Sequence, residues 1–67
     1  MNKVGDLITK WQDGRIVGQM MVTRIVTERE LHGAWVNVTR VYAMDYSDVI
    51  GCVGPVRLIS EDLEVTE

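Results

Sequence analysis

The sequence is poor in the residues that support disulfide-linked and metal-stabilised small folds. Its 67 residues include one cysteine, one histidine, one proline and no phenylalanine. A single thiol excludes an intrachain disulfide, so we expect a reducing compartment, the cytoplasm. One cysteine and one histidine cannot supply the three or four side chains of a zinc site. We therefore expect no metal and no other cofactor.

Long apolar runs are also missing. No stretch approaches the roughly 18 consecutive apolar residues of a membrane-spanning helix. Residues 1–6 lack the apolar core of a signal peptide. The sequence therefore predicts neither export nor insertion into a membrane.

Catalytic groupings are equally sparse. Cys52 would need a base to become a nucleophile, and only His32 could serve. Ser60, Asp62 and His32 carry the side chains of a hydrolytic triad, but Ser60 is better placed as a helix cap. No glycine-rich phosphate loop opens a helix. We expect a protein that is not an enzyme and has no small-molecule substrate.

The net charge of −3 is unevenly distributed. Residues 60–67 contain four acids and no base, whereas residues 1–59 contain seven bases and six acids. The bases are scattered among acids and form no run. The negative sum disfavours non-specific binding to nucleic acid or membranes, but the nearly neutral body keeps nucleic acid open as an alternative partner.

What the sequence has in abundance is β-branched residues. Eleven Val, five Ile and five Thr stand against four Leu and two Ala, a composition typical of strands. Gly and Asp bound several short windows that alternate or run continuously apolar. The predicted strands cover residues 7–11, 15–27 and 34–41. A fourth covers residues 49–53, is interrupted at Gly54-Pro55 and resumes at 56–59, and the last covers residues 64–66. Tight-turn residues at 13–14, a polar connection at 28–33, a loop at 42–48 and a helical turn at 60–63 would join them.

The second predicted strand contains a change of apolar phase. Ile16, Met20 and Val22 share one parity, whereas Ile25 has the other. Such a slip is typical of a bulge, and Gly18 is a second natural place for one. We expect this strand to be curved.

The core is predicted from alternation on the other strands. Val36 and Val38 should face inward while Asn37 and Thr39 face outward. Cys52, in an apolar run, is expected to be a buried strand residue.

Three segments resemble the turn pattern of Src-homology-3-like small barrels, especially the stand-alone ones of bacteriophages and bacteria. They are Val4-Gly5-Asp6-Leu7-Ile8, Gly14-Arg15-Ile16-Val17-Gly18 and Ile59-Ser60-Glu61-Asp62-Leu63-Glu64-Val65. The resemblance implies one mainly β domain over residues 1–67, a five-stranded barrel with the helical turn at 60–63. It also implies a phage or bacterial accessory protein, located in the host cytoplasm if a phage encodes it. Closure into a barrel would remove exposed strand edges.

Gly5-Asp6 and Gly18 also resemble, more weakly, the KOW motif of ribosomal and transcription-elongation barrels. That resemblance implies a nucleic-acid-binding barrel as the alternative function. Its contacts would come from bases on the barrel, and the candidates are Arg15, Arg24 and Arg40.

The leading expectation is a non-enzymatic interaction module that binds a protein partner or itself, since so short a chain can only just bury enough apolar surface to fold. Aromatic and methionine side chains would form the contact surface. The candidates are Trp11, Met20, Met21, Trp35, Tyr42 and Tyr46. Two alternatives stay open: the two Trp could pack in the core, and adjacent Met20 and Met21 could place one side chain outward or share an inward bulge.

Overall fold

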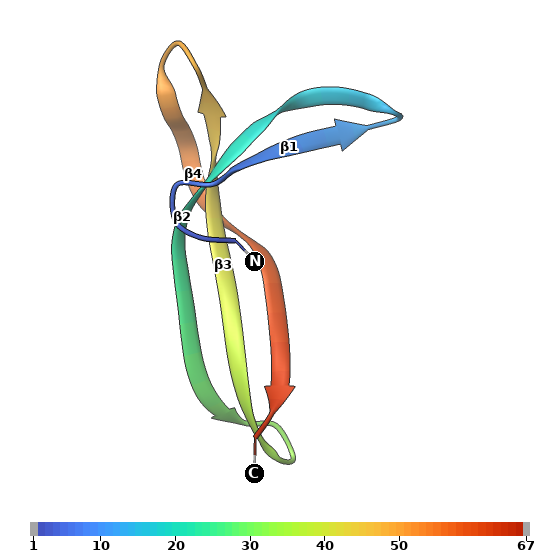
Figure 1. Ribbon diagram of the computed structural model, residues 1–67, viewed down its shortest axis with the longest axis vertical. Helices are drawn as coiled ribbons and strands as arrows, with labels where there is room; N and C mark the ends of the chain where they lie inside the picture. The colour runs from blue at the N-terminus through green and yellow to red at the C-terminus, as the bar shows by residue number, and fades with distance from the viewer. Residues whose placement is uncertain (1, 67) are drawn as a thin grey trace.

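The protein is a single antiparallel sheet. The computed structural model describes residues 2–66 and orders four strands as β1-β2-β3-β4 (Figure 1). They are β1 (Leu7–Gln12), β2 (Arg15–Leu31), β3 (Trp35–Ser47) and β4 (Gly51–Val65). The predicted mainly β class is confirmed, and neighbours in sequence are neighbours in the sheet.

The strands are longer than local sequence signals predict. Residues 28–31 continue β2, and residues 42–47 continue β3, where a connection and a loop were expected. Cross-strand pairing explains the extension, since Glu28 lies opposite Val38 and Tyr42 opposite Leu58. The turn at 13–14 is as predicted, with Asp13 at φ 52° and Gly14 at φ 75°.

The last third of the chain differs most from expectation. Residues 60–63 lie within β4, so the predicted helical turn is wrong and Ser60 is no cap. Ser60 pairs with Val41 and Leu63 with Val38, and this register continues to Val65, so residues 64–65 extend β4 and form no fifth strand. Pro55 is also part of β4, which is tolerable because β4 is an edge strand.

Bulges bend the sheet at one level, near Val22–Arg24 on β2 and Val41–Tyr42 on β3, which we call the bulge level. The β2–β3 register shifts between Val22 and Arg24, which leaves Thr23 as the extra residue and confirms the bulge predicted from the change of apolar phase. The β3–β4 register shifts at the same level, between Val41 and Tyr42. A further bulge on β2, opposite Lys10 and Trp11, adjoins Gly18 as expected. Above this level the β1–β2 hairpin swings away from the long three-stranded part (Figure 1).

Alternation and register divide the side chains between two faces. The threonine face carries Thr27, Thr39 and Val41, and the arginine face carries Arg24, Arg40 and Val38. Six of the described residues are buried apolar side chains, and all lie on the two central strands. They are Met20, Val22, Val36, Val38, Val41 and Ala43. The predicted inward positions of Val36 and Val38 are confirmed.

The sheet stays open instead of closing into a barrel. Its radius of gyration is 14.4 Å, whereas a compact domain of this length has about 11 Å. Its accessible surface is 5035 Å², against about 4,300 Å² for a compact monomer of 7.6 kDa. Within residues 2–66 no helix and no second sheet packs on its faces, although the segment before β1 crosses one face, where Asn2 lines a hollow (Figure 1).

Candidate functional site

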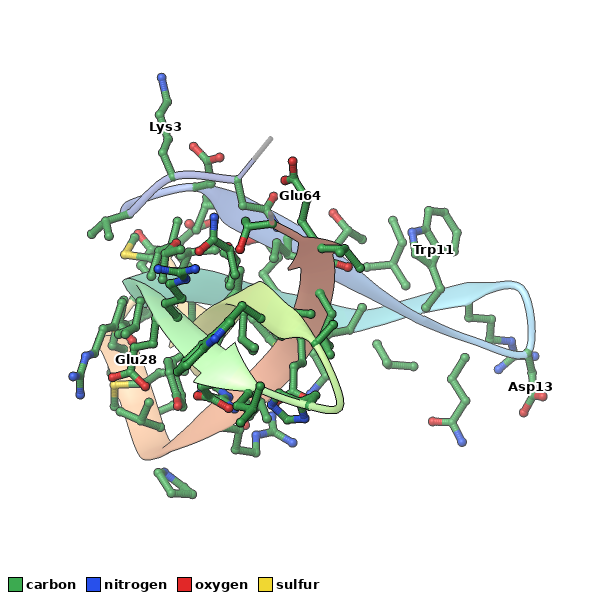
Figure 2. The ribbon with its side chains drawn as sticks, turned by 90° about the horizontal axis from the view of Figure 1, so that it is seen from below. Lys3, Trp11, Asp13, Glu28 and Glu64 are labelled. Atoms are coloured by element: carbon green, nitrogen blue, oxygen red, sulfur yellow. The ribbon has the colours of Figure 1, made fainter. Side chains whose placement is uncertain are left out.

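The two tryptophans lie at opposite ends of β2. Trp11 pairs with Ile16 near the start of β2, and Trp35 pairs with Leu31 at its end, so almost the whole 17-residue strand separates them. At about 3.3 Å per residue that is on the order of 50 Å of strand. Trp11 is 65% exposed and Trp35 48% exposed, so neither packs in the core. Figure 2 shows Trp11 on the projecting hairpin, toward the tip marked by Asp13.

Three of the other candidates share the arginine face. Met21, Tyr42 and Tyr46 lie there, because Met21 is opposite Met44 and the side chains alternate along β3. Met20 is buried on the threonine face. The methionine pair is therefore split between the two faces, as a regular strand requires. The structure brings three of the six candidates together and leaves both tryptophans apart from them.

Cys52 belongs to this same surface. It pairs with Tyr46 on β3, and its Sγ donates to Met21 Sδ over 3.8 Å. The thiol is exposed, so the expectation of a buried strand residue is wrong. Its strand assignment is correct, but β4 is an edge strand with no layer above it. Cys52, Met21 and Tyr46 form a small sulfur and aromatic surface.

The three candidate arginines do not converge. Arg15 lies at the hairpin turn and Arg24 lies more than half of β2 away from it. The Arg24 guanidinium carbon is 5.9 Å from the Tyr42 ring centroid. Arg40 is engaged by carboxylates of two neighbouring strands, so little of its charge is available to a phosphate.

The Arg40 ion pairs form the main electrostatic cluster of the arginine face. Arg40 Nη1 donates to Glu30 Oε2 at 2.7 Å, and Arg40 Nε donates to Glu61 Oε2 at 2.8 Å. The hydrogen bond from Arg40, helped by a bond to His32, lowers the pKa of Glu30 to about 2. The same carboxylates raise the pKa of Arg40. His32 lies in the exposed β2–β3 turn.

A second cluster lies on the threonine face above the bulge level. Asp45 Oδ1 accepts from Lys10 Nζ at 3.1 Å and from Arg57 Nη2 at 2.6 Å. The bond from Lys10 is the main cause that lowers the pKa of Asp45, and the charge of Arg57 adds to it. Asp45 thus connects β1 and β4 through β3.

The threonine face is hollowed below the bulge level. A hollow of about 570 Å³ has Ile25 and Val41 in its lining, and Thr27 and Thr39 join their hydroxyls there over 3.0 Å. Its other lining residues are Asn2, Ser60, Asp62 and Glu64. Ser60 Oγ donates to Asp62 Oδ2 there over 3.5 Å, whereas His32, the third side chain of the triad named from the sequence, bonds to Glu30 in the β2–β3 turn region. Within residues 2–66 no three His, Cys, Asp or Glu side chains are grouped as metal ligands would be.

The sequence interpretation missed the exposed aliphatic side chains at the hairpin ends, which are Leu31, Val49 and Ile50. Val49 is 90% exposed, and Ile50 follows it in the β3–β4 turn, where a strand was predicted to begin. Leu31 and Trp35 flank the β2–β3 turn and are also exposed. Polar residues usually occupy such turns, so the apolar pair between Asp48 and Gly51 was the available signal.

Residues 2–66 contain no helix with the length and apolar character needed to cross a membrane. Comparison with known proteins found no matching family model, no similar curated protein and no matching solved structure. The function must therefore be inferred from the sequence and geometry of this chain.

Proposed function

We propose that this protein is a small non-enzymatic interaction module that assembles with copies of itself. The observation that carries the proposal is the surface excess of the open sheet. The chain exposes about 700 Å² more than a compact monomer of its mass, and a standard protein interface covers about 800 Å² on each partner. One interface of ordinary size would bring the chain to the exposure of a compact domain.

The position of the exposed apolar side chains supports the same function. All three hairpin ends carry them, with Trp11 and Ile16 at one, Leu31 and Trp35 at the next, and Val49 in the third. Exposed apolar side chains do not stabilise a turn that faces water, whereas contact surfaces use Trp and large aliphatic side chains as anchors.

The barrel implied by the Src-homology-3 resemblance takes a modified form in this proposal. Strands of a neighbouring copy, and not a fifth strand of the same chain, would extend the sheet. A chain that assembles in this way could serve as an accessory component of a phage or bacterial assembly. The simple strand order and the two free edges of the sheet support this form.

Sedimentation velocity over a micromolar to millimolar concentration series tests the proposal. We expect the mean mass to rise above the 7.6 kDa of one chain as concentration increases. Light scattering after size-exclusion chromatography gives an independent mass. A monomer throughout the series would remove the proposed function.

A further inference from the structure

The second half of β2 is an open strand edge. β1 pairs with β2 only as far as Met21, and the last backbone bonds to the N-terminal segment are at Val22. Gly5 N donates to Val22 O at 2.8 Å, and Val22 N donates to Asp6 O at 2.9 Å. Beyond that point residues 24–31 pair with β3 on one side, and no other described strand lies on their other side. About 26 Å of backbone is therefore free to pair.

The side chains along this edge are complementary to themselves. Arg24, Val26 and Glu28 alternate onto the arginine face as base, apolar residue and acid. In an antiparallel pair with Val26 opposite Val26 of the second copy, Arg24 lies opposite Glu28 of the second copy. The two-fold axis repeats the contact, so two opposite-charge pairs flank one apolar pair.

Both charged groups are available for this contact. The Glu28 side chain is 58% exposed, and its Oε2 lies 3.6 Å from Arg40 Nη1, a looser approach than the 2.7 Å of Glu30. Arg24 is exposed, and the structure pairs it with no carboxylate among residues 2–66. Cross-copy pairing would leave the close bonds of Arg40 intact.

The other long edge opposes self-pairing. The free side of β4 over residues 58–65 carries Glu61, Asp62 and Glu64 and no base. Two such strands would bring like charges together, a common protection of strand edges.

We infer that two copies join edge to edge through residues 24–28 of β2, with Val26 on the two-fold axis and Arg24 of each copy facing Glu28 of the other. A continuous sheet then runs through both chains, with β4 of each copy at its outer edge in this region. This inference rests on the proposed self-assembly and names the surface that carries it.

Charge exchange tests the register. Arg24→Glu and Glu28→Arg each replace two attractive contacts with two repulsive ones, so each variant alone should raise the dimer dissociation constant about tenfold or more. An equimolar mixture of the two variants should restore a dimer, since both contacts become attractive again. Lys3→Glu is the matched control, because it makes the same charge change at a side chain that projects away from the sheet (Figure 2), and it should dissociate like the unaltered protein.

The outcomes separate this inference from the function on which it rests. A wild-type protein that is monomeric at every concentration overturns both. A wild-type protein that assembles, with both variants assembling equally well, overturns only the β2 edge. Weakened variants that fail to recover on mixing overturn the Arg24–Glu28 register. Circular dichroism checks the fold of each variant. If a charge-reversed variant does not fold, Arg24→Gln and Glu28→Gln replace it, and each of these neutral variants is expected to weaken the dimer.

Discussion

Arg40 and Glu30 form a two-point ion pair across the arginine face. Nη1 donates to Oε2 at 2.7 Å and Nη2 donates to Oε1 at 3.2 Å. Because the guanidinium is planar, both bonds fix the relative position of the two side chains. The pair joins β3 to the part of β2 that has no neighbour on its other side.

This ion pair predicts a loss of stability in acid. Glu30 has a folded pKa of about 2, below its ordinary value of 4.5, so the folded state favours the ionised carboxylate. Its stabilising contribution is complete above about pH 4.5 and disappears as the pH falls toward about 2. We expect the urea midpoint to decrease over that window, as followed by circular dichroism. Glu30→Gln should flatten this part of the profile, and an unchanged slope in that variant would contradict the assignment.

Substitution of a fully buried valine should be costly. Val38 is 1% exposed on the central strand, so Val38→Ala removes two buried methyl groups and should lower the free energy of unfolding by about 2 kcal/mol. Urea denaturation at neutral pH measures the change. Val49→Ala is the control, because Val49 lies in an exposed turn and its change should stay within about 0.5 kcal/mol. Equal effects of the two substitutions would show that the core is placed wrongly.

The β2 bulge offers a stabilising substitution. Thr23 Oγ1 is buried and has no hydrogen-bond partner among the described residues. Thr23→Val keeps the shape and removes the unpaired hydroxyl, so we expect the free energy of unfolding to rise by about 1 kcal/mol. Thr27→Val serves as the comparison, since it removes a hydroxyl that is bonded to Thr39 and should bring no gain. A loss of stability in Thr23→Val would mean that the hydroxyl has a partner in solution.

The exposed thiol should react in the native state. Cys52 lies on the edge strand β4, so an aromatic disulfide reagent should label it nearly as fast in buffer as in urea. Absorbance of the released thiolate follows the reaction, and Cys52→Ser provides the blank. Labelling that waits for unfolding would place the thiol in a buried position.

Features that depend on side-chain alternation were predictable from the sequence. The opposite parities of Val22 and Ile25 located the Thr23 bulge, and alternation placed Val36 and Val38 in the core. The Asp13-Gly14 turn was equally clear because its residue types accept a positive φ. Each of these signals lies within a few residues of the feature it predicts.

Features that depend on distant pairing were not predictable. Ser60 followed by acids has the local pattern of a helix cap, yet pairing of β4 with β3 opposite Val41 prevails over four residues of helical preference. The tryptophans were candidates for the core because a barrel without phenylalanine needs other large side chains inside it. A sheet without a second layer has no place for them, and no local signal reveals whether a sheet closes.

The candidate surface was recovered in part for the same reason. Met21, Tyr42 and Tyr46 come together because β2 and β3 pair in register, which the sequence does not specify. The apolar turn around Val49 was hidden by its β-branched residues, whose strand propensity is high. Exposure, and not residue type, distinguishes that turn from a strand.

The uninterrupted β1-β2-β3-β4 order has a consequence for folding kinetics. Every strand pairs only with the strands adjacent to it in the chain, so each step closes a hairpin and no step closes a long loop. The six buried side chains all belong to the β2–β3 hairpin, whose turn spans residues 32–34. That hairpin can form first and grow outward from its turn, with β1 and β4 added afterwards. Each pairing then grows from its turn, so residues that lie far apart in the sequence, such as Val36 and Val65, are joined last.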